Sequence, residues 1–198
     1  MRRLLPRAAL IVLLVFGSVE SVRGLWIPAK AELAQVLMQR AWRQSRAEID
    51  RARPWPWADT WPVARLRLPD HGVDLIVLAG SSGATMAFAP GHLHGSAAPG
   101  EDGICVISGH RDTHFAVLED LDPGQRVELE DRTGVWHGYV VTETVVVHQS
   151  DVEALGWGGP GSLVLMTCWP FDSLYPGSEL RFLVYAENAD SRRKSCSL

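Results

Sequence analysis

From Val63 onward, the chain is a series of short strand-like segments separated by turns rich in Gly, Pro and Asp. Val63 to Leu68 alternates apolar and polar side chains, which is typical of a half-buried strand. Further apolar or β-branched segments lie at 74–78, 104–107, 126–130, 135–147, 163–167 and 180–186. Short strands spaced in this way indicate a mainly β domain, a mixed or antiparallel barrel. One short helix is expected within it, from Asp112 to Leu121.

The N-terminus has the pattern of an export signal. Three arginines precede an uncharged run of 12 residues, Ala8 to Val19. A bilayer span needs about 20 residues, and extension of the run to Ile27 includes Glu20 and Arg23. We expect residues 1–27 to be an uncleaved signal anchor, because no small-residue cleavage site follows the run. A cleaved signal peptide and a buried core helix are the alternatives.

Three further regions follow this segment. A helix is expected from Pro28 to about Ala47, because apolar residues recur there at helical spacing. It forms, with a short linker, a juxtamembrane region at 28–53. Prolines in the segment RPWPWADTWP then end the helix, and its tryptophans are expected to pack against the domain. The barrel is expected over 54–190, followed by a polar tail at 191–198.

Charge is distributed unevenly along the chain. Residues 1–53 hold 10 Lys or Arg against 4 Asp or Glu, whereas residues 54–198 hold 9 against 19. An acidic folded part argues against nucleic-acid binding, which requires Lys and Arg to neutralise phosphates. The basic N-terminal part instead indicates a membrane-proximal segment. Arginines ahead of the apolar run place the N-terminus in the cytoplasm and the barrel across the membrane.

The three cysteines, Cys105, Cys168 and Cys196, do not form a disulfide scaffold or a CxxC zinc motif. An H-x-H pair, His92 and His94, is the one weak metal pattern. We expect no metal and no cofactor.

Three residues are candidates for chemistry because of where they lie on predicted strands. Cys168 follows the apolar run 163–166, and His110 follows the run 104–107. Both would therefore lie where a buried strand ends in a loop. Arg181 lies inside an apolar strand, where a charge either faces solvent or has a specific partner. Taken alone, each has an ordinary structural explanation: a core thiol, a structural histidine and an exposed arginine.

Together the three residues form a coherent catalytic set. A cysteine thiol attacks an amide carbonyl when a nearby base or a lowered pKa provides the thiolate. His110 can pair with the thiolate of Cys168 and then protonate the leaving amine. Arg181 can donate hydrogen bonds to the oxyanion of the tetrahedral intermediate.

These motifs resemble those of the sortase family. The segment 91–131 resembles the central part of sortases, with its G-H-x-x-G-S loop, P-G-E and catalytic G-H-R. The family's nucleophile motif TLxTC occurs here as VLMTC, with Val164 in place of the first Thr. The arginine strand R-x-x-V-x-A matches 181–186. PWPWADT and the WPF after the cysteine are most similar to the Gram-negative sortase subgroup (class GN).

The resemblance, over roughly residues 55–187, implies a closed β-barrel of about eight strands with short helices. It implies a cysteine transpeptidase that cleaves the Thr–Gly bond of an LPxTG-like C-terminal sorting signal. Its thioacyl-enzyme is resolved by an amine of peptidoglycan or of a protein, or by water. The implied enzyme is a monomer tethered to the inner membrane by a single pass, with a periplasmic catalytic domain.

The resemblance also indicates supporting residues. Thr167 is expected to line the substrate groove or support the cysteine, together with Leu165. Asp112 is expected either to orient His110 or to face solvent. His92 is expected in a loop near the barrel mouth.

Two rival interpretations stay open at this point. The first is another cell-envelope cysteine peptidase. It is disfavoured because the S-H-G-C motif of L,D-transpeptidases is absent, and because papain-like enzymes place the cysteine before the histidine. The second is a membrane-tethered β-barrel that binds a partner without turnover.

Overall fold

The computed structural model describes residues 13–14, 16–17, 20, 30, 32–46, 51–173 and 177–189. Most of the predicted signal anchor at 1–27, and all of the tail at 191–198, lie outside these residues. In the described part, no helix is both long and apolar enough to cross a membrane. The chain divides into two compact units, Met1–Leu37 and Met38–Leu198. Residues 32–46 are helical and lie within the predicted helix.

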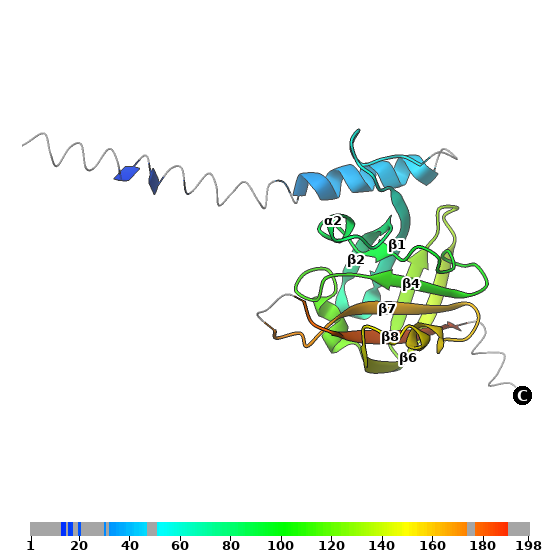
Figure 1. The fold of residues 1–198 in the computed structure, drawn as a ribbon. Helices are drawn as coiled ribbons and strands as arrows, with labels where there is room; N and C mark the ends of the chain where they lie inside the picture. The colour runs from blue at the N-terminus through cyan, green and yellow to red at the C-terminus, as the bar shows by residue number, and fades with distance from the viewer. Residues whose placement is uncertain are drawn as a thin grey trace, which may run out of the picture. The chain divides into compact units, whose positions relative to one another are not determined.

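The second unit contains a barrel of eight strands (Figure 1). The strands are β1 (Pro62–Leu68), β2 (Val73–Ala79), β3 (Gly91–His92), β4 (Ile104–Ser108), β5 (Arg126–Glu130), β6 (Trp136–His148), β7 (Ser162–Trp169) and β8 (Leu180–Asn188). Short helices interrupt them: η1 (Pro69–His71), α2 (Gly83–Met86), η2 (Ala116–Asp120) and η3 (Glu153–Gly156). The predicted helix over 112–121 is thus reduced to the 3-10 helix η2.

The strands close in the order β1-β2-β3-β4-β7-β8-β6-β5. Two neighbouring pairs, β2 with β3 and β4 with β7, are parallel, and the remaining pairs are antiparallel. This confirms the predicted closed barrel of about eight strands, and of the two alternatives, mixed or antiparallel, the barrel is mixed. The two-residue strand β3 was not predicted, because two residues are too short to show any periodicity.

The main core fills the inside of the barrel. Strand β1 shows why: its buried and half-buried residues alternate along all seven positions, so that every second side chain faces inward. Phe115 and Leu118, from the segment after β4, are fully buried in the same core. The chain that follows His110 is therefore attached to the barrel interior.

Two smaller apolar clusters lie on the outside of the barrel wall. One joins Met38 and Trp42, from the helical residues, to Ile76 and Leu78 of β2. The other joins Ala154 of η3 to side chains of β4, β7 and β8. The connection between β6 and β7 is therefore held against the outer face of the strands that carry the candidate residues.

The proline- and tryptophan-rich segment is only partly packed. Trp55 contacts the outer cluster on β2, and its ring lies 5.0 Å from that of Phe88 in an edge-on arrangement. Trp57 is 82% exposed. The expectation that all these tryptophans pack against the domain was therefore wrong for Trp57.

Candidate active site

His110 and Cys168 are brought together by the parallel pairing of β4 with β7. Ser108 is the Cα partner of Met166, the last pair of this ladder. The hydrogen bonding continues one residue further, because the N–H of Gly109 donates to the carbonyl of Met166 at 3.1 Å. Two residues beyond the last pair, the chain reaches Cys168 within β7 and His110 just after the end of β4. Both candidates therefore lie at the same end of the β4–β7 ladder.

Arg181 is placed on the other side of Cys168 by the antiparallel pairing of β7 with β8. The two residues are direct Cα partners, with Thr167 opposite Phe182 and Trp169 opposite Leu180. Directly opposite residues of an antiparallel pair point to the same face of the sheet. The three candidates thus lie near the C-terminal ends of β4 and β7 and the N-terminal end of β8, and these three strands are neighbours in the barrel (Figure 1).

Thr167 and Leu165 lie on the inner face of β7, next to the candidate site. Leu165 is fully buried in the barrel core. Thr167 is buried, and its hydroxyl donates to the carbonyl of Gly109 at 2.8 Å. This bond ties the residue before the candidate nucleophile to the residue before His110. The distance between the end of β7 and the loop that carries His110 therefore depends on the side chain of this buried threonine.

An aromatic cluster packs beside Thr167 at the end of β7. The rings of Trp169 and Phe182 are stacked at 5.7 Å, and Phe171 meets both edge-on, at 5.6 Å and 5.3 Å. Phe171 and Phe182 also pack against the barrel core. The WPF segment therefore fixes the strand end on the face opposite to Cys168.

The guanidinium of Arg181 is held by three acceptors. Nη1 donates to the carbonyls of Ser178 at 2.7 Å and Leu180 at 2.9 Å. Nη2 donates to Oε1 of Gln149 at 2.8 Å. An arginine carries five N–H donors, so the Nε–H and one Nη2–H have no partner among the described residues.

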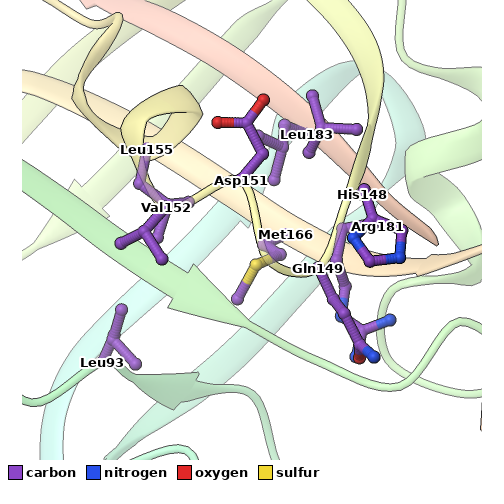
Figure 2. A pocket seen from close by; sticks show the side chains of 10 residues that line it. Leu93, His148, Gln149, Asp151, Val152, Leu155, Met166, Arg181 and Leu183 are labelled. Atoms are coloured by element: carbon purple, nitrogen blue, oxygen red, sulfur yellow. The ribbon is translucent and has the colours of Figure 1, made fainter. Parts of the chain in front are cut away.

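A cavity of about 290 Å³ lies beside Arg181 on the outer face of the barrel (Figure 2). Its apolar lining comes from Leu93, Val147, Val152, Leu155, Met166 and Leu183. Its polar lining is His148, Gln149, Asp151 and Arg181. Most of these residues belong to the end of β6 and to the connection that carries η3. The cavity offers an apolar side chain a place next to the candidate site.

The loop that follows His110 is compact. The carbonyl of His110 accepts a hydrogen bond from the N–H of the buried Phe115 at 3.0 Å. His114 lies in this turn, half-buried. Burial, together with the nearby charge of His110, lowers the pKa of His114, although a bond with the backbone of Phe88 partly opposes the shift. A second histidine thus lies near the candidate base.

The structure does not bring Asp112 or His92 to His110. Asp112 is exposed, and no hydrogen bond or ion pair joins it to His110 in the described residues. His92 lies in strand β3 and not in the predicted loop; its ring contacts the carbonyl of Ala97 at 2.8 Å and the hydroxyl of Ser96 at 3.0 Å in the segment that follows. In the part of the chain that the structure describes, no group of three or more His, Cys, Asp or Glu could hold a metal ion.

The two described cysteines differ sharply in environment. Cys105 is buried in the barrel core, and burial raises its pKa to about 12. It is therefore an unreactive thiol at neutral pH, as expected. Cys168 is partly exposed and carries no disulfide. Cys196 lies outside the described residues.

Three residues near the site were not assigned from the sequence: Arg111, His114 and Gln149. Arg111 follows His110 in the G-H-R motif, and its Nη2 donates to the carbonyl of Ser173 at 3.1 Å, in the connection from β7 to β8. His114 also lies in the motif region, so both could have been found by closer attention to G-H-R-D-T-H. Gln149 has no such signal, because its contact with Arg181 depends on how β6 pairs with β8.

Comparisons with known proteins agree with this geometry. A family model described as the sortase domain matches residues 66–189. Sortase D of Bacillus subtilis (strain 168) is 28% identical over 123 residues, which are 62% of this chain and 61% of that protein. This chain therefore matches less than two thirds of that relative's length.

Solved structures give the same result. Sortase C-1 from Actinomyces oris is 28% identical, with a TM-score of 0.57 over 65% of this chain and 72% of that chain. A lid mutant of sortase A from Corynebacterium diphtheriae is 26% identical, with a TM-score of 0.58 over 82% of this chain and 95% of that chain. The matched region contains all three strand ends described above. The chain therefore belongs to the sortase family of cysteine transpeptidases.

Proposed function

We propose that this protein is a membrane-anchored sortase that cleaves an LPxTG-like C-terminal sorting signal and transfers it to an amine. Its catalytic residues are Cys168, His110 and Arg181. The observation that carries the proposal is the placement of these residues on three adjacent strand ends, with Cys168 directly opposite Arg181.

The first step forms a covalent intermediate. The thiolate of Cys168 attacks the carbonyl carbon of the scissile Thr–Gly bond, and a tetrahedral oxyanion forms. Two unengaged N–H groups of Arg181 are suited to donate to that oxygen, which stabilises the transition state more than the substrate. The C–N bond then breaks, and His110 gives a proton to the leaving amine. A thioester between Cys168 and the new C-terminal threonine remains.

The second step releases the product. An acceptor amine attacks the thioester carbonyl, and the same oxyanion site stabilises the second tetrahedral intermediate. His110 takes the proton of the incoming amine while the C–S bond breaks. A new amide forms, and the thiolate of Cys168 is restored. Water in place of the amine gives hydrolysis.

The cavity beside Arg181 supports a peptide substrate with an apolar side chain. Its lining is mainly Leu, Val and Met, and His148 and Gln149 lie on the same side of it as Arg181 (Figure 2). Burial of one leucine-sized side chain in such a cavity contributes about 1.5–3 kcal/mol. An LPxTG-like signal supplies such a side chain a few residues before the scissile bond.

The proposed membrane location and the proposed sortase subgroup rest on features of the sequence. The arginine-flanked apolar run at 8–19 supports an inner-membrane anchor with the barrel on the periplasmic side. PWPWADT and the WPF after Cys168 support the Gram-negative subgroup. The acceptor is an amine of peptidoglycan or of a protein.

The test uses the full-length chain, an LPxTG-type fluorogenic peptide and a small amine. Wild type is expected to cleave the peptide and to form the amide product. Cys168→Ala and His110→Ala are expected to lose both activities, whereas Cys105→Ala, a control at the buried thiol, retains them. Persistent turnover by Cys168→Ala would contradict the proposal. A wild-type chain that binds the peptide without cleaving it would favour a binding module.

A further inference from the structure

We propose that Gln149 is a positioning residue for Arg181: it holds the guanidinium in one orientation and leaves two N–H groups for the substrate oxyanion. This inference rests on the proposed role of Arg181. Gln149 contributes no atom to the reaction and acts only through the arginine.

The backbone of Gln149 is fixed relative to Arg181. His148 and Leu180 are the last Cα partners of the β6–β8 ladder. The N–H of Gln149 then donates to the carbonyl of Glu179 at 2.7 Å, so the pairing extends past the end of the strand. The glutamine side chain therefore extends from an ordered strand end two residues away from Arg181 in the neighbouring strand.

In the contact between Gln149 and Arg181, only one assignment of donor and acceptor is possible. A guanidinium donates and cannot accept, so the amide oxygen of Gln149 must face Nη2, at 2.8 Å. Figure 2 shows the ends of the Gln149 and Arg181 side chains together at one side of the cavity. Because the amide is neutral, the contact orients the guanidinium without cancelling its positive charge. A carboxylate at this position would neutralise part of that charge.

The acceptors of Arg181 explain why Gln149 matters. Nη1 is bound to the carbonyls of Ser178 and Leu180, both within three residues of Arg181 itself. Gln149 is the acceptor from another strand, and it binds the other Nη nitrogen. Acceptors on two nitrogens fix the plane of the guanidinium. Loss of the Gln149 acceptor frees this plane, and small displacements of an oxyanion donor greatly reduce the rate.

Two substitutions separate positioning from other roles. Gln149→Met keeps the side-chain length and removes the acceptor, whereas Gln149→Glu keeps an acceptor. For the full-length chain with an LPxTG-type peptide, we expect Gln149→Met to lower the rate of acylation about 10-fold, with KM within about two-fold of wild type. Gln149→Glu should recover part of this loss. Because Gln149 is exposed, the melting temperature of both variants should stay within about 2 °C of wild type.

A double-mutant cycle then tests whether Gln149 acts through the arginine. In an Arg181→Ala background, Gln149→Met should change the slow acylation, followed by intact mass, by less than about two-fold. Gln125→Met is the matched control, because the amide oxygen of Gln125 accepts from the N–H of Asp122 at 3.0 Å in another part of the barrel. This control should match wild type.

Several results would overturn the inference. They are an unchanged acylation rate in Gln149→Met, a rate in Gln149→Glu no higher than in Gln149→Met, or equal effects of Gln149→Met with and without Arg181. The proposed function fails separately, if Arg181→Ala or Cys168→Ala acylates as fast as wild type. If Arg181→Ala acylates slowly but Gln149→Met acylates as fast as wild type, the role of Gln149 is rejected and the proposed function stands.

Discussion

Cys168 and Arg181 are direct cross-strand partners in the antiparallel β7–β8 ladder, so their side chains leave the same face of the sheet. We therefore expect Arg181→Ala to lower the acylation rate of an LPxTG-type peptide by about 10²–10³-fold, the usual cost of removing an oxyanion donor. Arg181→Lys keeps the charge but lacks the planar fork, so it should recover only part of the rate. Discontinuous assays with a fluorogenic peptide measure the acylation rates of both variants. A rate for Arg181→Ala within two-fold of wild type contradicts this role.

Thr167 should matter for stability and activity together. Thr167→Val removes the hydroxyl that donates to the buried carbonyl of Gly109. An unsatisfied buried acceptor costs about 1–3 kcal/mol, and the loop that carries His110 loses its tie to β7. Thr167→Ser keeps the hydroxyl and should stay closer to wild type. Urea unfolding and peptide cleavage report the two effects, and equal behaviour of the Val and Ser variants would argue against the bond.

Gly109 should tolerate no side chain. A Cβ at this position would lie 2.8 Å from Cγ of the fully buried Phe115 ring. Gly109→Ala should therefore destabilise the fold by about 1–3 kcal/mol, as overpacking does, and displace His110. Gly159→Ala is the control, because nothing lies within 4 Å of its added Cβ. Equal stability of the two variants in denaturant unfolding would contradict the close packing of Gly109 against the ring of Phe115.

The cysteines should react very differently with an alkylating reagent. Burial raises the pKa of Cys105 to about 12, whereas Cys168 is partly exposed. In a Cys196→Ser background at pH 8, iodoacetamide should modify Cys168 in the native protein and Cys105 only after unfolding. Peptide mapping by mass spectrometry identifies the labelled thiol. Rapid native labelling of Cys105 would show that the barrel core is open.

Asp131, in the hairpin between β5 and β6, should make the stability of the fold depend on pH. Burial raises its pKa, but hydrogen bonds from Thr133, His137 and the backbone of Val135 outweigh burial and hold the pKa below its ordinary value. A depressed native pKa stabilises the fold above the unfolded value of about 3.9, and this stabilisation is lost as the pH falls through the native pKa. Asp131→Asn should therefore be less stable than wild type at pH 7, by at most about 1 kcal/mol because solvent screens this partly exposed group. Urea unfolding should show this gap narrowing below about pH 4; a gap that is constant down to pH 3 would contradict the assignment.

The strands of the barrel were largely predictable because inward and outward side chains alternate. Strand β5, Arg126–Glu130, was found with the same bounds as predicted; β1 is one residue longer than predicted at its start, and β2 is one residue longer at each end. Motifs also indicated Cys168, His110 and Arg181 as the candidates. What the sequence could not supply is the pairing that makes them neighbours: the parallel β4–β7 ladder and the register of β7 with β8.

Gln149 shows this limit most clearly. The β6–β8 ladder has a register shift between Val141 and Glu143. One extra residue in a strand changes which later side chains face which side, so the alternation in β6 does not reveal where its last residues point. The contact between Gln149 and Arg181 follows from this register. No local pattern in the sequence encodes it.

Cys168 should form a thioacyl intermediate with the cleaved sorting signal. The direct measurement is intact mass and peptide mapping of the full-length chain after incubation with an LPxTG-type peptide in the absence of an amine. We expect an adduct of the cleaved peptide on Cys168, which hydroxylamine removes and which is converted to an amide product when an amine is added. An absent adduct, or an adduct on Cys105 or Cys196 in place of Cys168, would contradict it.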